Sequence, residues 1–213
     1  MTSFIIVRHA QSLANKDNIF AGHFDIDLTE LGRKQAELAA RYIQARFHVD
    51  KIYVSDLKRT CQTAEPIARL CKLEPIKTPE FREIYAGDWE GMSFEKIQET
   101  FRDDYMLWRT DVGKAAPTNG ESTQALGERV WKKLEEIAKE NPDKTVVIVT
   151  HATPVRAVLC RLCGYAFSEM QNVGWTPNAS ATVVQTDGKE WTLLQTGIDE
   201  YLVGNVSVLP PNV

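Results

Sequence analysis

The feature that most constrains the fold is a repeated order in which a short apolar run precedes a long stretch of helical periodicity. Residues 4–7, 51–54 and 145–149 have the length and composition of strands buried on both faces of a sheet. Parallel strands require long crossover connections, and helical crossovers cover both faces of the sheet they join. The order therefore predicts an α/β fold, a three-layer sandwich in which a mainly parallel sheet lies between helices.

Capping residues mark where the connecting helices begin. Thr29 and Ser122 are expected N-caps, Ser55-Asp56 offers capping groups for a second helix, and Thr153-Pro154 is an N-cap followed by a proline in the first turn. The predicted helices span residues 29–47, 56–73, 122–140 and 153–163.

The end of the chain carries a hairpin signal. Residues 181–185 and 191–195 read as strands joined by the turn Asp187-Gly188, so the sheet is expected to be mixed. Residues 75–120 are less regular, with prolines near the start and short helical stretches, and are expected to form a lid-like insertion. Residues 1–213 show no repeat or linker, which predicts a single domain.

Composition limits the kinds of partner. The net charge of the 213-residue chain is −4, whereas proteins that bind nucleic acid usually carry a basic excess. No apolar run approaches the roughly 20 residues that span a bilayer, and the first residues do not form a signal peptide. We therefore expect a cytoplasmic protein with neither nucleic-acid nor membrane partners, and the oligomeric state stays open, a homodimer included. Cys160 and Cys163 have no second ligand pair nearby, so we expect packing rather than metal binding.

Charged side chains follow the buried strands at the edge where α/β folds bind ligands. The first strand ends in Arg8-His9, the strongest strand leads into His151, and Arg59 lies in the first turn of the helix after the second strand. Arginine in a first helical turn opposes the helix dipole, and two arginines beside two imidazoles repel one another unless an oxyanion lies between them. The joint occurrence of these residues predicts a phosphate site, although a histidine after a strand is by itself more often structural.

Phosphoryl transfer also needs a nucleophile and an acid. Histidine is a competent nucleophile toward phosphorus, and a carboxylic acid can protonate the leaving oxygen. Glu83, in the irregular segment, is the candidate acid, and His23 lies in a loop that could reach a substrate.

These residues stand in an order that resembles the histidine phosphatase (phosphoglycerate mutase-like) superfamily. Each block of the similarity is short, but the ordered set is specific and extends to about residue 200. The blocks are Arg8-His9-Ala10-Gln11-Ser12 with Asn15, Gly22 and Asp25, residues 28–32, Gln35-Ala36, residues 55–60, Glu83, residues 87–91, residues 120–122 and His151.

The resemblance implies a role for each site residue and no metal or other cofactor. His9 would carry a transient phosphoryl group, and Glu83 would protonate the leaving group. Arg8, Arg59 and His151 would bind the phosphate oxygens, and Asn15, Gly22, His23 and Ala152 would contact the substrate, a small phosphorylated metabolite.

Three features leave alternatives open. Ala10 and Ala152 stand where the family usually has glycine, which would strain the backbone if either position needed a positive φ. The residues after Glu83 resemble the phosphatase branch, with a cofactor-dependent phosphoglycerate mutase and a non-catalytic protein that binds phosphorylated ligands as the alternatives. The aromatic residues of the insertion either line a pocket or pack the insertion onto the domain. They are Tyr85, Trp89, Phe94, Tyr105 and Trp108.

Overall fold

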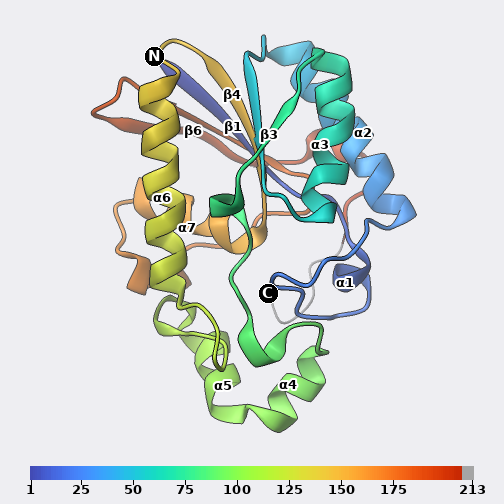
Figure 1. Ribbon diagram of the computed structural model, residues 1–213, viewed down its shortest axis with the longest axis vertical. Coiled ribbons are helices and arrows are strands. Elements are labelled where there is room, and N and C mark those ends of the chain that lie inside the picture. The colour runs from blue at the N-terminus through green and yellow to red at the C-terminus, as the bar shows by residue number, and fades with distance from the viewer. Residues whose placement is uncertain (208–213) are drawn as a thin grey trace.

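The computed structural model describes residues 1–207, and a six-stranded sheet forms its centre (Figure 1). The strand order is β3-β2-β4-β1-β5-β6, in which β1 to β4 pair in parallel and β5 and β6 pair antiparallel. The predicted mixed, mainly parallel sheet is therefore confirmed. Its strands are β1 (Thr2–Arg8), β2 (Lys51–Val54), β3 (Pro75–Lys77), β4 (Thr145–Thr150), β5 (Ala181–Thr186) and β6 (Trp191–Ile198).

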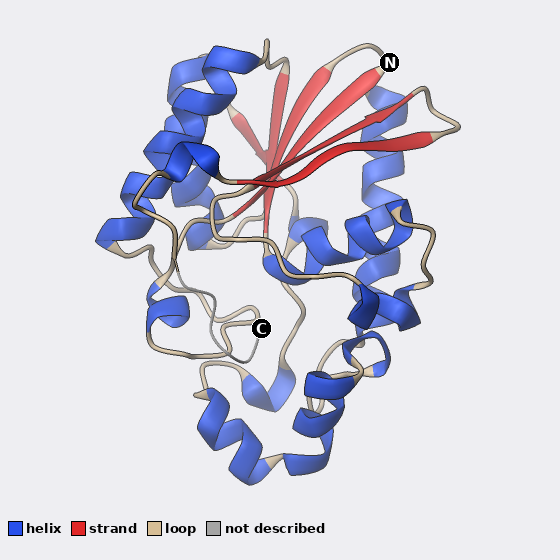
Figure 2. Ribbon diagram, turned by 180° about the vertical axis from the view of Figure 1, so that it is seen from behind, coloured by secondary structure: helices blue, strands red, loops and turns tan. Residues whose placement is uncertain are grey.

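Helices cover both faces of the sheet, which confirms the three-layer sandwich (Figure 2). α2 and α3 pack on one face, and α6 and α7 pack on the other. In residues 1–207 no helix is long and apolar enough to cross a membrane. The α-helices are α1 (Leu13–Lys16), α2 (Glu30–Arg46), α3 (Lys58–Cys71), α4 (Phe94–Thr100), α5 (Arg102–Thr110), α6 (Thr123–Glu140) and α7 (Ala152–Leu162).

Alternate side chains of the central strands enter two separate cores. In β1, Phe4 and Ile6 belong to the core beneath α6 and α7, whereas Ile5 and Val7 belong to the core beneath α2 and α3. Both faces of β1 are thus removed from water, and burial of each such side chain stabilises the fold by about 1.5–3 kcal/mol. This explains why the strand is a continuous apolar run in the sequence.

Two of the predicted caps are confirmed and two are wrong. The Thr29 side chain accepts from the Gly32 amide at 2.9 Å, and Ser122 accepts from the Ala125 amide. α3 instead begins after Leu57 and α7 begins after His151, and neither residue makes a side-chain cap bond. Both helices start at the carboxyl edge of the sheet, where their first amide groups are available to other partners.

The segment 75–120 lies around the carboxyl ends of the strands. Its first three residues form β3, an edge strand that the sequence pattern did not single out, and α4 and α5 lie below the sheet edge (Figure 1).

The two cysteines of the Cys-x-x-Cys pattern have different surroundings. Both are free, and Cys160 is buried as expected for a packing residue. The prediction is wrong for Cys163, which is exposed because α7 ends at Leu162 and Cys163 is its C-cap.

Candidate active site

The carboxyl edge of the sheet brings together the two arginines and two histidines that the sequence places there. His9 follows β1 and His151 follows β4, and the centroids of their rings are 5.2 Å apart. Arg59, in the first turn of α3, donates from Nε to Nδ1 of His151 at 3.2 Å. Arg8 is the last residue of β1, and none of the four side chains is more than 4% exposed.

The neighbouring backbone fixes the tautomer of His9. Its Nδ1 lies 2.7 Å from the carbonyl oxygen of Ala10. A carbonyl oxygen only accepts hydrogen bonds, so Nδ1 carries the proton and Nε2 holds a lone pair. Burial lowers the pKa of His9 well below its usual value, and the charges of Arg59 and Arg8 lower it further. His9 is therefore a neutral imidazole with one nitrogen available as a nucleophile.

His151 has the opposite tautomer. Its Nδ1 accepts from Arg59, so Nε2 carries the proton and donates to Oγ of Ser55 at 2.8 Å. Burial, followed by the charge of Arg59, lowers the pKa of His151 well below its usual value. Ser55, which was predicted to cap a helix, instead orients this histidine.

The two arginines have N–H groups that are not used in hydrogen bonds to the described part of the protein. Arg59 donates to the carbonyls of Phe24 at 3.1 Å and Gly22 at 2.7 Å in addition to His151, so three of its five N–H groups are used. Arg8 donates to the Thr176 carbonyl, and its buried Nε has no partner within residues 1–207. Burial lowers the pKa of each guanidinium to about 10, which leaves both charged at neutral pH. An oxyanion would satisfy these donors.

Gly22 is required by the loop that anchors Arg59. Its φ is +49°, and a side chain at this position would lie within 2.6 Å of Glu90 and Ala86. The same loop carries Asp25, whose Oδ1 accepts from the first amide of α3, at Lys58, at 2.7 Å. Asp25 thus replaces the cap that α3 lacks at its own N-terminus.

Asn15 presents its amide NH₂ group to the cluster. Its Oδ1 accepts from the Ser12 amide at 3.0 Å and from Nδ2 of Asn178 at 3.2 Å. An oxygen must receive both bonds, so the amide nitrogen is left for a ligand. Asn178 also donates to the His9 carbonyl at 3.1 Å.

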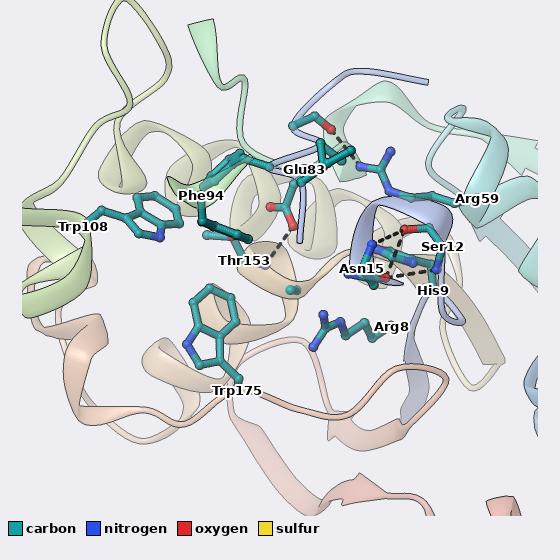
Figure 3. Close-up of a pocket in the computed structure, with 15 residues that line it drawn as sticks. Arg8, His9, Ser12, Asn15, Arg59, Glu83, Phe94, Trp108, Thr153 and Trp175 are labelled. Atoms are coloured by element: carbon teal, nitrogen blue, oxygen red, sulfur yellow. Dashed lines mark hydrogen bonds between the residues drawn. The ribbon is translucent and has the colours of Figure 1, made fainter. Parts of the chain in front are cut away.

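Glu83 lies at the N-terminus of α7. Its Oε2 accepts from the Thr153 amide at 3.3 Å, and its Oε1 accepts from the Ile84 amide at 2.9 Å. The side chain of Thr153 is therefore not the predicted cap, since its backbone amide bonds to a distant carboxylate. These two bonds hold the carboxyl group of Glu83 over the cluster (Figure 3).

Arg129 fixes the backbone that carries Glu83. Its five N–H groups are all used: three donate to the carbonyls of Glu80, Arg82 and Glu83, at 2.7 to 3.0 Å. The other two form a bidentate pair with Glu121, at 2.7 and 2.8 Å. Sequence reasoning missed Arg129, because a charged residue within an amphipathic helix normally reads as solvated.

His23 shares this positioning role. Its Nε2 lies 2.9 Å from the Glu83 carbonyl, to which it donates, and its ring contacts that of Tyr85. Asp56, another residue predicted to cap a helix, instead forms a bidentate ion pair with Arg82 in the same segment.

An open cavity, whose empty space of about 580 Å³ includes a part open to solvent, lies beside the cluster and has two chemically different ends (Figure 3). We call Arg8, His9, Asn15 and Arg59 the cationic base, and Ile19, Phe20, Phe94, Trp108 and Trp175 the aromatic wall. Glu83 lies between them. The remaining lining residues are Ser12, Ala21, Gly22, Ala152 and Thr153.

The predicted substrate-binding residues divide between lining and support. Asn15, Gly22 and Ala152 line the cavity, whereas His23 lies outside its lining. His151, which was predicted to bind the phosphate oxygens, also lies outside the lining. Neither Ala10 nor Ala152 has a positive φ, so alanine causes no backbone strain at these positions.

The aromatic residues also divide. Phe94 and Trp108 line the cavity, Trp89 and Tyr105 are buried in packing, and Tyr85 is exposed. Trp175 and Asn178 were missed. Both precede β5, and because β5 is antiparallel, its start lies at the same sheet edge as the carboxyl end of β1. The sequence signal that could have identified them is their position just before a strand that the hairpin pattern predicts to be antiparallel.

Residues 1–207 contain no group of three His, Cys, Asp or Glu side chains arranged to hold a metal ion. The positive charges that line the cavity come instead from the two arginines, Arg8 and Arg59.

Comparison with known proteins finds a family and similar folds. The model of the histidine phosphatase superfamily (branch 1) matches residues 4–199. Phosphoserine phosphatase 1 of Hydrogenobacter thermophilus is 38% identical over 202 residues, which cover 95% of each chain.

Two solved structures have the same fold. Bacillus stearothermophilus YhfR superposes with a TM-score of 0.90 at 23% identity, over 95% of this chain and all of that one. Mycobacterial glucosyl-3-phosphoglycerate phosphatase in complex with VO3 superposes with a TM-score of 0.85 at 27% identity, over 92% of this chain and 99% of that one.

Proposed function

This chain belongs to the histidine phosphatase superfamily (branch 1) and is a phosphatase of that type, and from this premise we propose that it hydrolyses small phosphomonoesters through a phosphohistidine on His9. The reaction needs no metal, because cationic side chains neutralise the charge that develops on the phosphoryl oxygens. Glu83 is the proton donor to the leaving group.

Binding places the phosphate of the substrate against the cationic base. The unused N–H groups of Arg8 and Arg59 donate to the phosphate oxygens, and the amide of Asn15 adds a neutral donor. The backbone at Ala152 contributes the positive end of the α7 dipole. His151 lies outside the cavity lining and acts through Arg59, from whose Nε its Nδ1 accepts a hydrogen bond.

The first chemical step forms a phosphoenzyme. Nε2 of His9 attacks phosphorus, the N–P bond forms, and the bond from phosphorus to the ester oxygen breaks. Protonated Glu83 gives its proton to that oxygen, so the leaving group departs as an alcohol. The proton on Nδ1 stays on the ring, where the Ala10 carbonyl stabilises the phosphorylated imidazole.

The second step releases phosphate. Glu83, now a carboxylate, accepts a proton from water while the water oxygen attacks phosphorus. The N–P bond breaks, its electron pair returns to Nε2, and inorganic phosphate leaves. Both protein groups are restored, because Glu83 regains the proton that it gave away.

The observation that carries this proposal is the 2.7 Å contact between His9 Nδ1 and the Ala10 carbonyl. It fixes the proton on the nitrogen that faces the backbone and leaves the lone pair on the other nitrogen, in the cavity between two buried arginines. A histidine that served packing alone would not need a free ring nitrogen that faces a cavity.

Hydrolysis of p-nitrophenyl phosphate in the presence of EDTA tests the proposal. We expect phosphate release with EDTA equal to that without it. Release that disappears with EDTA and returns with a divalent cation would contradict a metal-independent mechanism.

The same preparation distinguishes the alternatives. Bisphosphate-dependent interconversion of phosphoglycerates, with no release of phosphate from simple esters, would favour a mutase. Binding of inorganic phosphate with no turnover of any ester would favour a binding protein.

A further inference from the structure

The aromatic wall is a preformed surface. Trp108 contacts Phe20 edge to face, with ring centroids 5.2 Å apart, and Phe20 contacts Phe94 at 5.7 Å. The Arg156 guanidinium lies 4.4 Å from the centroid of the Trp175 ring, and Nε of Arg156 is bonded to the Val173 carbonyl. Trp89, outside the cavity, packs against both Phe20 and Trp108, and Arg156 packs against Trp175. The wall is therefore supported from behind, and its cavity side is available without rearrangement.

The wall has no charged side chain. All the charged residues that line the cavity within the described part of the chain are Arg8, Arg59 and Glu83, with His9 neutral, and each has a role at the reacting phosphate. Arg156 does not line the cavity. A carboxylate group carried by a leaving group would therefore lie against the negative faces of aromatic rings with no partner for its charge.

The position of Glu83 determines that the leaving group extends toward the aromatic wall. Glu83 lies between the cationic base and the aromatic wall (Figure 3). The ester oxygen must lie beside Glu83 to receive its proton. The substituent on that oxygen then extends away from the base, toward Phe94, Trp108 and Trp175.

We propose that the preferred substrates are phosphomonoesters whose leaving group is an apolar or aromatic alcohol, and that zwitterionic esters such as phosphoserine are poor substrates. This inference rests on the proposed function, because it concerns the leaving group of the same reaction. The proposed substrate class differs from the substrate in the name of the relative from Hydrogenobacter thermophilus, phosphoserine phosphatase 1.

Four esters of primary alcohols test the inference, because they share the same chemistry at phosphorus. Phenethyl phosphate and n-hexyl phosphate have apolar leaving groups, whereas O-phosphoserine and glycerol 3-phosphate have charged or polar ones. We expect kcat/KM for phenethyl phosphate to exceed that for phosphoserine by roughly 100-fold, since an apolar pocket discriminates by this order.

Replacement of Trp175 links the preference to the wall. The ratio of kcat/KM for phenethyl phosphate to that for glycerol 3-phosphate should fall by about 10-fold in Trp175→Ala, which loses one aromatic contact. Phe94→Ala is a second variant with the same expected direction. Trp131→Ala is the matched control, because Trp131 is a partly buried tryptophan that contacts Trp191 and does not line the cavity.

The outcomes separate the two proposals. Hydrolysis of none of the four esters would contradict the proposed function itself. Hydrolysis of phosphoserine with a kcat/KM equal to or above that of phenethyl phosphate would overturn the substrate class and leave the phosphatase mechanism standing. An equal loss for all four esters in Trp175→Ala and Phe94→Ala would also overturn it, because the wall would then serve stability alone.

Discussion

The cationic base and the aromatic wall are held in place by different kinds of contact. In the base, hydrogen bonds to backbone carbonyls fix the imidazole ring and the guanidinium groups, as the bonds of His9 to Ala10 and of Arg59 to Gly22 illustrate. In the wall, the side chains are held by contacts between rings, such as that of Trp108 with Phe20. Directional bonds permit one arrangement, whereas ring packing accepts several.

The difference suggests how chemistry and selectivity are divided. The residues of the cationic base lie at strand ends and in first helical turns, so the sheet and the helices that follow its strands fix their positions. The wall comes from the loop after α1, from α4 and α5, and from the loop before β5. Substitutions in the base should therefore change the rate for every ester, and substitutions in the wall should change which ester is preferred.

Replacement of the nucleophile should give the largest effect. His9→Ala should lower kcat by at least about 10⁴-fold for every ester, because no other group can accept the phosphoryl. Phosphate release measures the loss, and binding of vanadate reports whether the base is intact. His48→Ala is the matched control, since His48 is exposed and lies outside the cavity lining. Unchanged turnover in His9→Ala would contradict the assignment of the chemistry to the cationic base.

Replacement of the proton donor should depend on the ester. Glu83→Gln should lower kcat for alkyl esters by roughly 10²–10⁴-fold, and much less for p-nitrophenyl phosphate, whose leaving group needs little protonation. Glu95→Gln, at an exposed glutamate in α4, is the control. Equal losses for alkyl and aryl esters would argue that Glu83 binds phosphate instead of protonating the leaving group.

Arg129 tests whether positioning of Glu83 matters. Arg129→Met should lower kcat for alkyl esters by about 10-fold, with a smaller loss for p-nitrophenyl phosphate, because the misplaced group is the proton donor. Its effect should be absent in a Glu83→Gln background, which a double-mutant cycle measures. Arg161→Met is the control, since Arg161 stacks on Trp131 and lies far from Glu83 in the chain. Additive losses would assign Arg129 a structural role only.

The buried histidines should make stability depend on pH. The folded-state pKa values of His9 and His151 are lowered, so below about pH 6.5 the unfolded chain binds protons that the folded chain does not. Their contribution is fully present above that pH and is lost as the pH falls. The free energy of unfolding should therefore drop as the pH falls from about 7 to about 5.

Urea unfolding at several pH values measures this drop. The variant with both His9→Asn and His151→Asn should show a flatter profile than the original chain. A profile that is equally steep in that variant would mean that other groups cause the pH dependence.

The base was far more predictable from the sequence than the wall. Arg8 and His9 end or follow a buried strand, and Arg59 lies in the first turn of the helix after the next one. The rule that ligands bind at the carboxyl edge of parallel strands places them together. Most of the strands and the long helices were predictable because continuous apolar runs and helical periodicity are local patterns, whereas the short edge strand β3 was missed. Caps were predictable at Thr29 and Ser122, which bond to their own helices.

The failures occur where a side chain serves a distant partner. Ser55 and Asp56 resemble caps, yet they bond to His151 and Arg82. Trp175 reaches the wall only because β5 runs antiparallel, and Arg129 reaches Glu83 only because α6 packs beside that segment. Such contacts depend on topology, which no local pattern contains.

The most direct test of the central claim is to trap the phosphoenzyme. Rapid mixing with a good ester, quenching during the first turnover, and peptide mass spectrometry would locate any phosphoryl group on the chain. We predict one phosphoryl group on the peptide that contains His9, formed at least as fast as kcat and absent from His9→Ala. Turnover at the full rate with no phosphorylated peptide, or with the phosphoryl group on another residue, would contradict the role of His9 as the nucleophile.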